Sequence, residues 1–160
     1  MADLLTHVLI AYVLLTALGW RVDWLTRRWV AVGTAGAAIP DLSKVDLLVD
    51  ADRLSAALGV PFEFDPIGTL GGVLLIAAAI ALLFGTRRRR AFAVLVAGGG
   101  SALVLDGLRL YADGNANYWL YPLWWRPPTP GWYVSSDPRV LVVGLAVAGG
   151  VFALDRWVMA

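Results

Sequence analysis

The stretch Phe84-Gly-Thr-Arg-Arg-Arg-Arg-Ala91 separates two long apolar segments, residues 67–84 and 91–111. Four consecutive arginines are costly to place in hydrocarbon, whereas each neighbouring segment approaches the roughly 20 apolar residues that cross a ~30 Å bilayer core. Positively charged turns between membrane helices remain on the cytoplasmic side. We therefore predict two antiparallel transmembrane helices whose connecting turn lies in the cytoplasm.

The other apolar segments extend this pair into an all-α bundle. Residues 4–20 and 140–158 are predicted to span the membrane, and the shorter segment 29–39 is predicted to be a partial or tilted span. Hydrophobic residues make up 59% of the 160-residue chain, and its mean hydropathy is +0.71. The prediction is a single integral membrane domain over residues 1–160, a polytopic bundle of four to five transmembrane helices.

The charges divide between two sides when the chain is threaded through these spans. The N-terminus is then outside and the C-terminus cytoplasmic. Eight arginines and two aspartates fall inside, whereas ten of the twelve acidic residues and the only histidine fall outside. No basic residue precedes segment 4–20 and no small-residue cleavage site follows it, so we do not expect a cleaved signal peptide. A multi-pass protein of the cell membrane is expected, with any active site on the outer face.

Two outer loops are predicted, at 41–66 and 112–138. In the first, residues 50–59 have an acidic start and a closing glycine, which predicts a small surface helix. The second is rich in Trp, Tyr and Pro. Its aromatic residues suit an interfacial belt, and the same loop could form a stiff lid that admits lipid headgroups; the sequence does not choose between the two.

Several classes of site are disfavoured. The chain has no cysteine, so neither a disulfide framework nor a thiolate nucleophile is expected. The glycine runs 71–72 and 98–100 match neither a P-loop nor a dinucleotide fingerprint, and close helix packing explains them better. The arginine run 87–90 lacks the interleaved aromatics of a nucleic-acid patch. The expected partners are membrane lipids, without nucleic acid or nucleotide.

Polar residues end three apolar segments on the outer side: His7, Asp41 and Asp106. Ionisable groups near a bilayer usually face the bundle interior or a water-filled cavity. One imidazole and two carboxylates from separate helices could hold a divalent ion of the zinc or manganese type. Such an ion activates water and polarises an ester or phosphoester oxygen. We predict these three residues as metal ligands.

Other residues allow further roles at this level. Asp65, Asp46 or Asp113 could supply another ligand or a general base, and Asp65 and Asp113 are the predicted catalytic residues. Asp106 and Arg109 share one helix face at a spacing of three residues. A purely structural pair between them is the alternative, and it predicts a non-catalytic scaffold or lipid-binding subunit.

Five short motifs follow one another along nearly the whole chain: Thr6-His7, Ala38-Ile-Pro-Asp41-Leu, Gly68-Thr-Leu-Gly-Gly72, Ser101-Ala-Leu-Val-Leu-Asp106 and Tyr121-Pro-Leu. In this order they resemble the small membrane-bound metal-dependent hydrolases related to bacterial inner-membrane hydrolases, and most closely their haloarchaeal branch. The resemblance implies a metal-dependent hydrolase, and we expect a lipid or envelope ester or phosphoester as its substrate.

The family pattern also carries histidines that this chain lacks. Gly68 stands where the third segment would carry one, and Ala102 stands four residues before Asp106 where the pattern has another. The loss of two imidazoles leaves a more oxygen-rich ligand set. An inactive member of the family is therefore a further interpretation.

Overall fold

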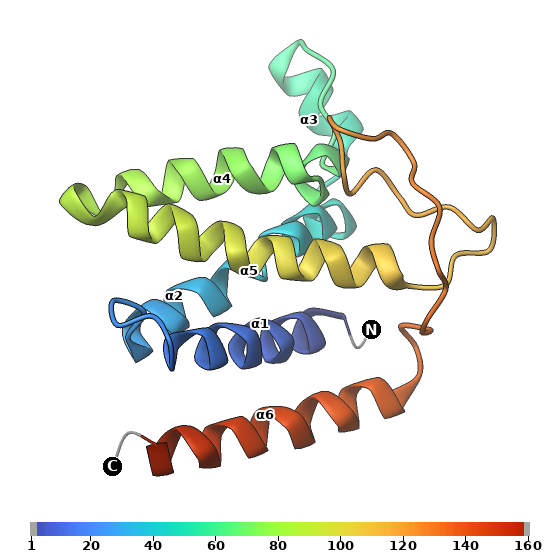
Figure 1. Cartoon of the computed structure of the whole chain (residues 1–160). Coiled ribbons are helices and arrows are strands. Elements are labelled where there is room, and N and C mark those ends of the chain that lie inside the picture. The colour runs from blue at the N-terminus through green and yellow to red at the C-terminus, as the bar shows by residue number, and fades with distance from the viewer. Residues whose placement is uncertain (1–2, 159–160) are drawn as a thin grey trace.

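The computed structural model describes residues 3–158, and within this range the chain is all-helical (Figure 1). The elements in chain order are α1 (Asp3–Gly19), α2 (Arg27–Gly36), the 3-10 segment η1 (Pro40–Leu47), α3 (Ala51–Leu58), η2 (Asp65–Gly68), α4 (Leu70–Leu82), η3 (Gly85–Arg87), α5 (Arg88–Leu108) and α6 (Pro138–Val158). The all-α prediction is confirmed.

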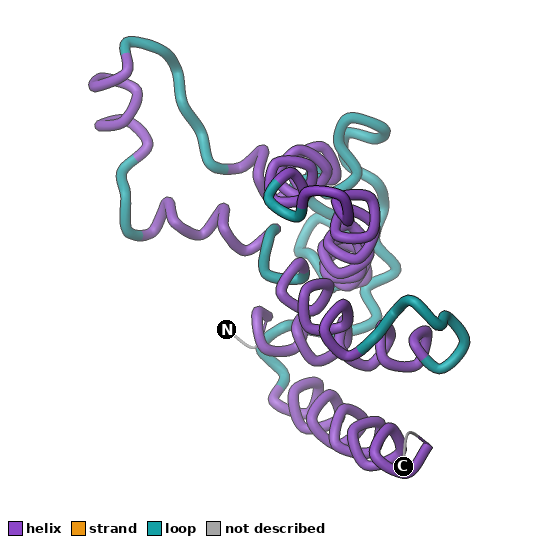
Figure 2. The backbone as a smooth tube through the Cα atoms, turned by 90° about the vertical axis from the view of Figure 1, so that its left-hand side faces the viewer, coloured by secondary structure: helices purple, strands orange, loops and turns teal. Residues whose placement is uncertain are grey.

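The helix α5 is the centre of the bundle, because α1, α2 and α4 all pack against it. The main packing partner of α6 is α1, and in Figure 1 α6 lies along the far side of α1. The segment from η1 through α3 extends away from the bundle, as Figure 2 shows. The core is thus built around α5, and α6 is attached at its periphery.

Glycines allow α2 and α5 to approach closely. A Cβ atom added at Gly98 would lie 1.8 Å from the backbone oxygen of Gly33, and one added at Gly36 would lie 2.6 Å from the backbone oxygen of Leu95. Both contacts are with backbone atoms, so a side chain at either position would force the helices apart. Close helix packing is confirmed for Gly98, whereas Gly100 of the same run faces open space.

The predicted surface helix is confirmed as α3. The Asp50 side chain accepts a hydrogen bond from the backbone N–H of Asp52 at 2.9 Å, and Gly59 ends the helix with φ 70°. A carboxylate at the N-cap and a left-handed glycine after the last turn are typical helix boundaries.

The third apolar segment starts its helix later than predicted. Residues 65–68 form the 3-10 turn η2, and α4 begins only after Thr69, whose hydroxyl accepts a hydrogen bond from the backbone N–H of Gly72 at 3.1 Å. The hydroxyl cap sets the first turn of the helix. Since α4 has 13 residues, its length is about 20 Å at 1.5 Å per residue.

Two helical segments are long and apolar enough to cross a membrane, Gly85–Leu108 and Pro138–Trp157, whereas Leu4–Gly19 and Leu70–Leu82 are apolar but shorter. In the second of the long segments 17% of the most apolar window is buried within the molecule. By length and composition, the described residues therefore contain two candidate membrane helices.

The basic segments meet at one end of the bundle. Arg27 Nε lies 2.9 Å from the Asp155 carboxylate, and the Arg90 guanidinium lies 5.6 Å from the ring centroid of Trp24. In Figure 1 the α1–α2 turn, the α4–α5 turn and the end of α6 all lie at the left. The fold thus places at one end of the bundle the arginines that were predicted to lie on one side of the membrane.

Candidate functional site

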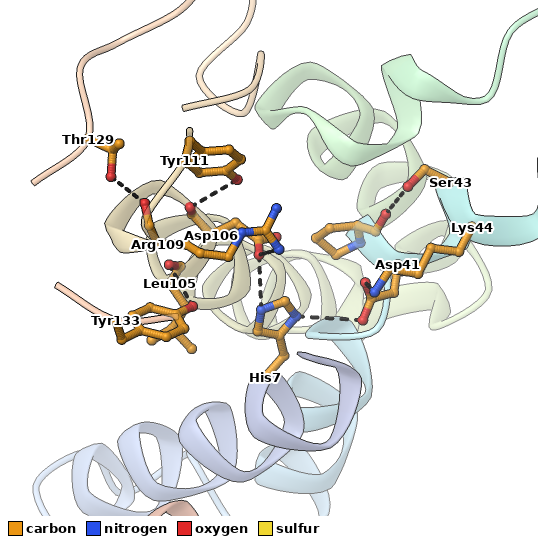
Figure 3. Close-up of polar contacts among 11 residues, drawn as sticks. His7, Asp41, Ser43, Lys44, Leu105, Asp106, Arg109, Tyr111, Thr129 and Tyr133 are labelled. Carbon is orange, nitrogen blue, oxygen red and sulfur yellow. Dashed lines mark hydrogen bonds and ion pairs between the residues drawn. The ribbon is translucent and has the colours of Figure 1, made fainter. Parts of the chain in front are cut away.

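The structure brings His7, Asp41 and Asp106 together at the other end of the bundle (Figure 3). The imidazole of His7, on α1, lies between a carboxylate at the start of η1 and another in the last turn of α5. Its Nδ1 is 3.6 Å from Asp41 Oδ2, and its Nε2 is 3.5 Å from Asp106 Oδ1. The His7 side chain is 2% exposed, so the two carboxylates are its main polar surroundings.

Two cations extend this row of charges. Lys44 Nζ forms an ion pair with Asp41, and Arg109 Nη1 lies 3.8 Å from Asp106 Oδ1. Burial disfavours the charged form of Asp41, but the neighbouring imidazole and ammonium outweigh it and hold the pKa of this carboxyl below its ordinary value. Asp41 is therefore a carboxylate at neutral pH, and it lies between the Lys44 ammonium and the His7 imidazole.

A layer of alanines explains why the three helical segments meet here. Ala11 lies four residues after His7, while Ala37 and Ala102 lie four residues before Asp41 and Asp106. All three alanines are 0% exposed and they pack against one another. Four residues are about one helical turn, so methyl contacts one turn away hold the backbones close enough for the polar side chains to touch.

Sequence reasoning missed this layer. In a chain so rich in alanine, the three positions do not stand out by composition. A usable signal exists nonetheless, because each of the three predicted metal ligands has an alanine four residues away, toward the bundle interior.

A polar pocket of about 300 Å³ lies over the cluster. Asp41 and Asp106 line it, whereas His7 lies below the lining. The other charged and hydrogen-bonding side chains of the pocket are Ser43, Lys44, Asp65, Thr69, Arg109, Tyr111, Asn117, Tyr118 and Trp119. A molecule in this pocket would meet carboxylates, two cations and several neutral donors together.

The two predicted catalytic acids are in different places. Asp65 lines the pocket. Asp113 is not among the lining residues and forms an ion pair with Arg126 in the exposed loop after α5. The backbone N–H of Asn115 and the Arg126 guanidinium lower the pKa of Asp113, which weakens it as a base. Asp65 is consequently the better placed of the two for a role in the pocket.

The two positions that lack an expected histidine also differ. Gly68 lines the polar pocket, and a Cβ atom there would meet its nearest neighbour, Ser43 Oγ, at an ordinary 3.4 Å. Ala102 belongs to the buried alanine layer. A side chain at position 68 would thus reach the pocket, and a larger one at position 102 would be forced into a helix interface.

The donor set suits a metal ion in part. Among residues 3–158 no group of three His, Asp or Glu side chains is arranged to hold an ion, because the two carboxylates face opposite nitrogens of one ring. The 3.5 Å between His7 Nε2 and Asp106 Oδ1 nevertheless suits two ligands that each lie about 2.0–2.2 Å from one ion. The three-ligand set stays a prediction; the geometry provides a two-ligand pair, and Asp65 lines the same pocket as Asp106.

The chain matches no protein-family model, no curated protein and no solved structure. The chain is therefore characterised by its own fold and site. It is a helical bundle with two candidate membrane helices and a basic end, and at the opposite end an imidazole lies between two carboxylates under a polar pocket.

Proposed function

We propose that this chain is a multi-pass membrane hydrolase that cleaves a lipid or envelope ester or phosphoester at the outer face. The observation that carries the proposal is the buried imidazole of His7 between Asp41 and Asp106, two carboxylates that line a polar pocket. Perturbed ionisable groups around a pocket are typical of active sites. The resemblance of the sequence motifs to membrane-bound hydrolases agrees with this reaction class.

The placement in a membrane with four or five spans, the N-terminus outside and the C-terminus in the cytoplasm, is supported by the surface of the bundle. Large apolar side chains are exposed on peripheral helices, among them Leu14 on α1, Leu75 on α4 and Val142 on α6. In water such a surface would favour aggregation, whereas in lipid it carries no such penalty. The arginine-rich end then faces the cytoplasm.

In the proposed site, Asp106 and His7 would hold a divalent ion of the zinc or manganese type. Asp41 contacts the other ring nitrogen and orients the imidazole, as carboxylates beside metal-bound histidines commonly do. The bound ion would polarise the substrate oxygen and make water a better nucleophile. Asp65 is the carboxylate in the pocket available as a general base or as a further ligand.

Lys44 and Arg109 give the pocket a preference for substrates that carry a phosphate or an ester carbonyl. Both line it, and each pairs with one of the two carboxylates below. An ammonium and a guanidinium bind the oxygens of phosphate or of an ester carbonyl well. They would hold the polar head of a lipid-derived substrate while its apolar part remains in the membrane.

Metal content and hydrolysis of the full chain in detergent test the proposal together. Asp106→Asn should lose the bound metal and the hydrolysis of ester and phosphoester probes. Asp52→Asn, which changes an exposed carboxylate on α3, is the matched control and should keep both. A metal-loaded and active Asp106→Asn protein would exclude the proposed ligand pair.

A second candidate, a non-catalytic scaffold or lipid-binding subunit, is favoured by one specific observation. The charges of the cluster are already compensated, since Arg109 lies 3.8 Å from Asp106 and Lys44 pairs with Asp41. A double-mutant cycle with Asp106→Asn and Arg109→Gln separates the two functions. A large coupling in the free energy of unfolding, in a protein that binds no metal, supports the scaffold.

A further inference from the structure

A second hollow lies between α1, α2 and α6, and it shares no lining residue with the polar pocket. It has a volume of about 610 Å³ and follows α1 from Val8 to Trp20. These twelve steps along a helix correspond to roughly 18 Å. The volume is within the range of about 300–1,000 Å³ that is typical of ligand sites. We call this hollow the α6 groove.

Most of the α6 groove is apolar. Its walls include Tyr12 from α1, Val30, Ala31 and Ala35 from α2, and Phe152 from α6. Ala31 and Ala35 are exposed along it, so nothing in the described chain covers this side of α2. The peripheral position of α6 leaves the groove open toward the surroundings of the bundle, which are hydrocarbon if the helices span a membrane.

One end of the groove is polar and carries a net positive charge. Asp155 accepts hydrogen bonds from Arg27 Nε at 2.9 Å and from Trp20 Nε1 at 3.2 Å. Arg156 lies beside them with its guanidinium carbon 5.1 Å from the ring centroid of Phe152. Two guanidinium groups thus accompany one carboxylate, and that carboxylate already has two donors.

A buried hydroxyl faces the same groove. Thr16 lines it, is only 5% exposed, and its Oγ1 has no hydrogen-bond partner among the described residues. A buried hydroxyl without a partner costs free energy that a bound acceptor would recover. Thr16 lies one helical turn before Trp20, so it is deeper in the groove than the charged end.

We propose that the α6 groove binds one acyl chain of an anionic phospholipid. The phosphate lies at Arg27 and Arg156, the hydroxyl of Thr16 donates to an ester carbonyl of the lipid, and the chain follows α1 toward Val8. Along α1 the groove passes from the cationic end to the Thr16 hydroxyl and then to Tyr12 and Val8, which is the order that the phosphate, ester and acyl chain of a phospholipid require. A second unpartnered hydroxyl of the lining, Thr34 Oγ1, lies on α2. The inference uses the membrane placement proposed above and none of the hydrolytic chemistry.

The test is lipid retention by the full chain, measured by native mass spectrometry after titration with phosphatidylglycerol or phosphatidylcholine of the same acyl composition. The unmodified chain should retain one phosphatidylglycerol about tenfold more tightly than phosphatidylcholine. Ala35→Phe fills the groove and should abolish that one tight site. Ala79→Phe adds the same ring on an exposed face of α4 and should leave it intact.

Ala31→Phe provides a second groove-filling variant one turn away on the same face of α2. Arg156→Gln should reduce the preference for phosphatidylglycerol several-fold, and Arg89→Gln, which removes a charge at the same end but outside the groove, should not. Tight binding that survives both phenylalanines, or an equal loss in both glutamine variants, overturns the inference. Asp106→Asn should retain the lipid, so failure of the hydrolase proposal remains distinguishable.

Discussion

At the residue scale, His7 links two carboxylates that would otherwise repel each other. It lies below the pocket and contacts Asp41 through one nitrogen and Asp106 through the other. These three residues were predicted to lie together because each ends an apolar segment on the same side. The ring nitrogen that faces each carboxylate could not be predicted, because it depends on the rotation of α1 relative to α5 and η1.

A histidine at position 68 should increase the affinity of the pocket for a metal ion. A histidine there would place an imidazole in the pocket that contains Asp65 and Asp106, and its Cβ would meet only ordinary contacts. Gly68→His should therefore raise the affinity for zinc about tenfold or more, as measured by titration calorimetry on the detergent-purified chain. Ser136→His, which adds the same group on an exposed loop position, should show no such gain. Equal affinities in the two variants would argue against an ion in the pocket.

The lowered pKa of Asp113 predicts how the stability of the loop after α5 depends on pH. Its carboxylate is stabilised by the backbone N–H of Asn115 and by Arg126, so its pKa lies below the ordinary 3.8. A lowered pKa means that the contact stabilises the folded loop above about pH 4, and that this contribution is lost as the pH falls through the lower folded value. Carbon-13 NMR of the carboxyl group should show the midpoint rising toward 3.8 in Arg126→Gln. Arg139→Gln should leave it unchanged.

At the scale of elements, the packing of α2 on α5 depends on single backbone contacts. The sequence showed a run of three glycines, and close helix packing was the prediction for all of them. Only the structure distinguishes Gly98, which faces the backbone of Gly33, from Gly100, which faces open space. That difference follows from the crossing point of the two helices, which no local pattern in the sequence specifies.

Gly98→Ala should destabilise the bundle, because its new methyl group would lie 1.8 Å from a backbone oxygen. Overpacking of this kind costs about 1–3 kcal/mol. Gly100→Ala adds the same methyl group on the same helix without a contact, so it should be neutral or slightly stabilising. Unfolding of both proteins in the same detergent measures the difference, and equal stabilities would contradict the close approach of α2 and α5.

At the scale of the molecule, charge and hydropathy predicted five apolar segments, four or five of them crossing the membrane, and the gathering of arginines at one end. The helices α1, α2, α4, α5 and α6 lie where the apolar segments were predicted. The boundaries near η2 could not be predicted, because the hydroxyl of Thr69 sets the start of α4. The α6 groove was also not predictable, since it depends on the distance between α6 and α2.

The absence of cysteine allows a direct test of the proposed topology. In intact cells, Ser136→Cys on the loop before α6 should react with a membrane-impermeant thiol reagent. Thr86→Cys, in the turn next to the arginine run, should react only after the membrane has been opened. The reverse labelling would invert the bundle and move the polar pocket to the cytoplasmic side, while equal protection of both would argue against a membrane-spanning pair.

The alanine layer limits the positions at which a further histidine can be added to this site. An imidazole can be introduced at position 68 without a close contact at its Cβ, because the nearest atom there, Ser43 Oγ, lies at an ordinary 3.4 Å. The same repair at position 102 would push α1 and α2 away from α5, because Ala102 packs against Ala11 and Ala37 with no exposed surface. Such a substitution would therefore move His7 away from Asp41 and Asp106. A histidine at position 102 would therefore require compensating changes at Ala11 and Ala37, whereas one at position 68 would not.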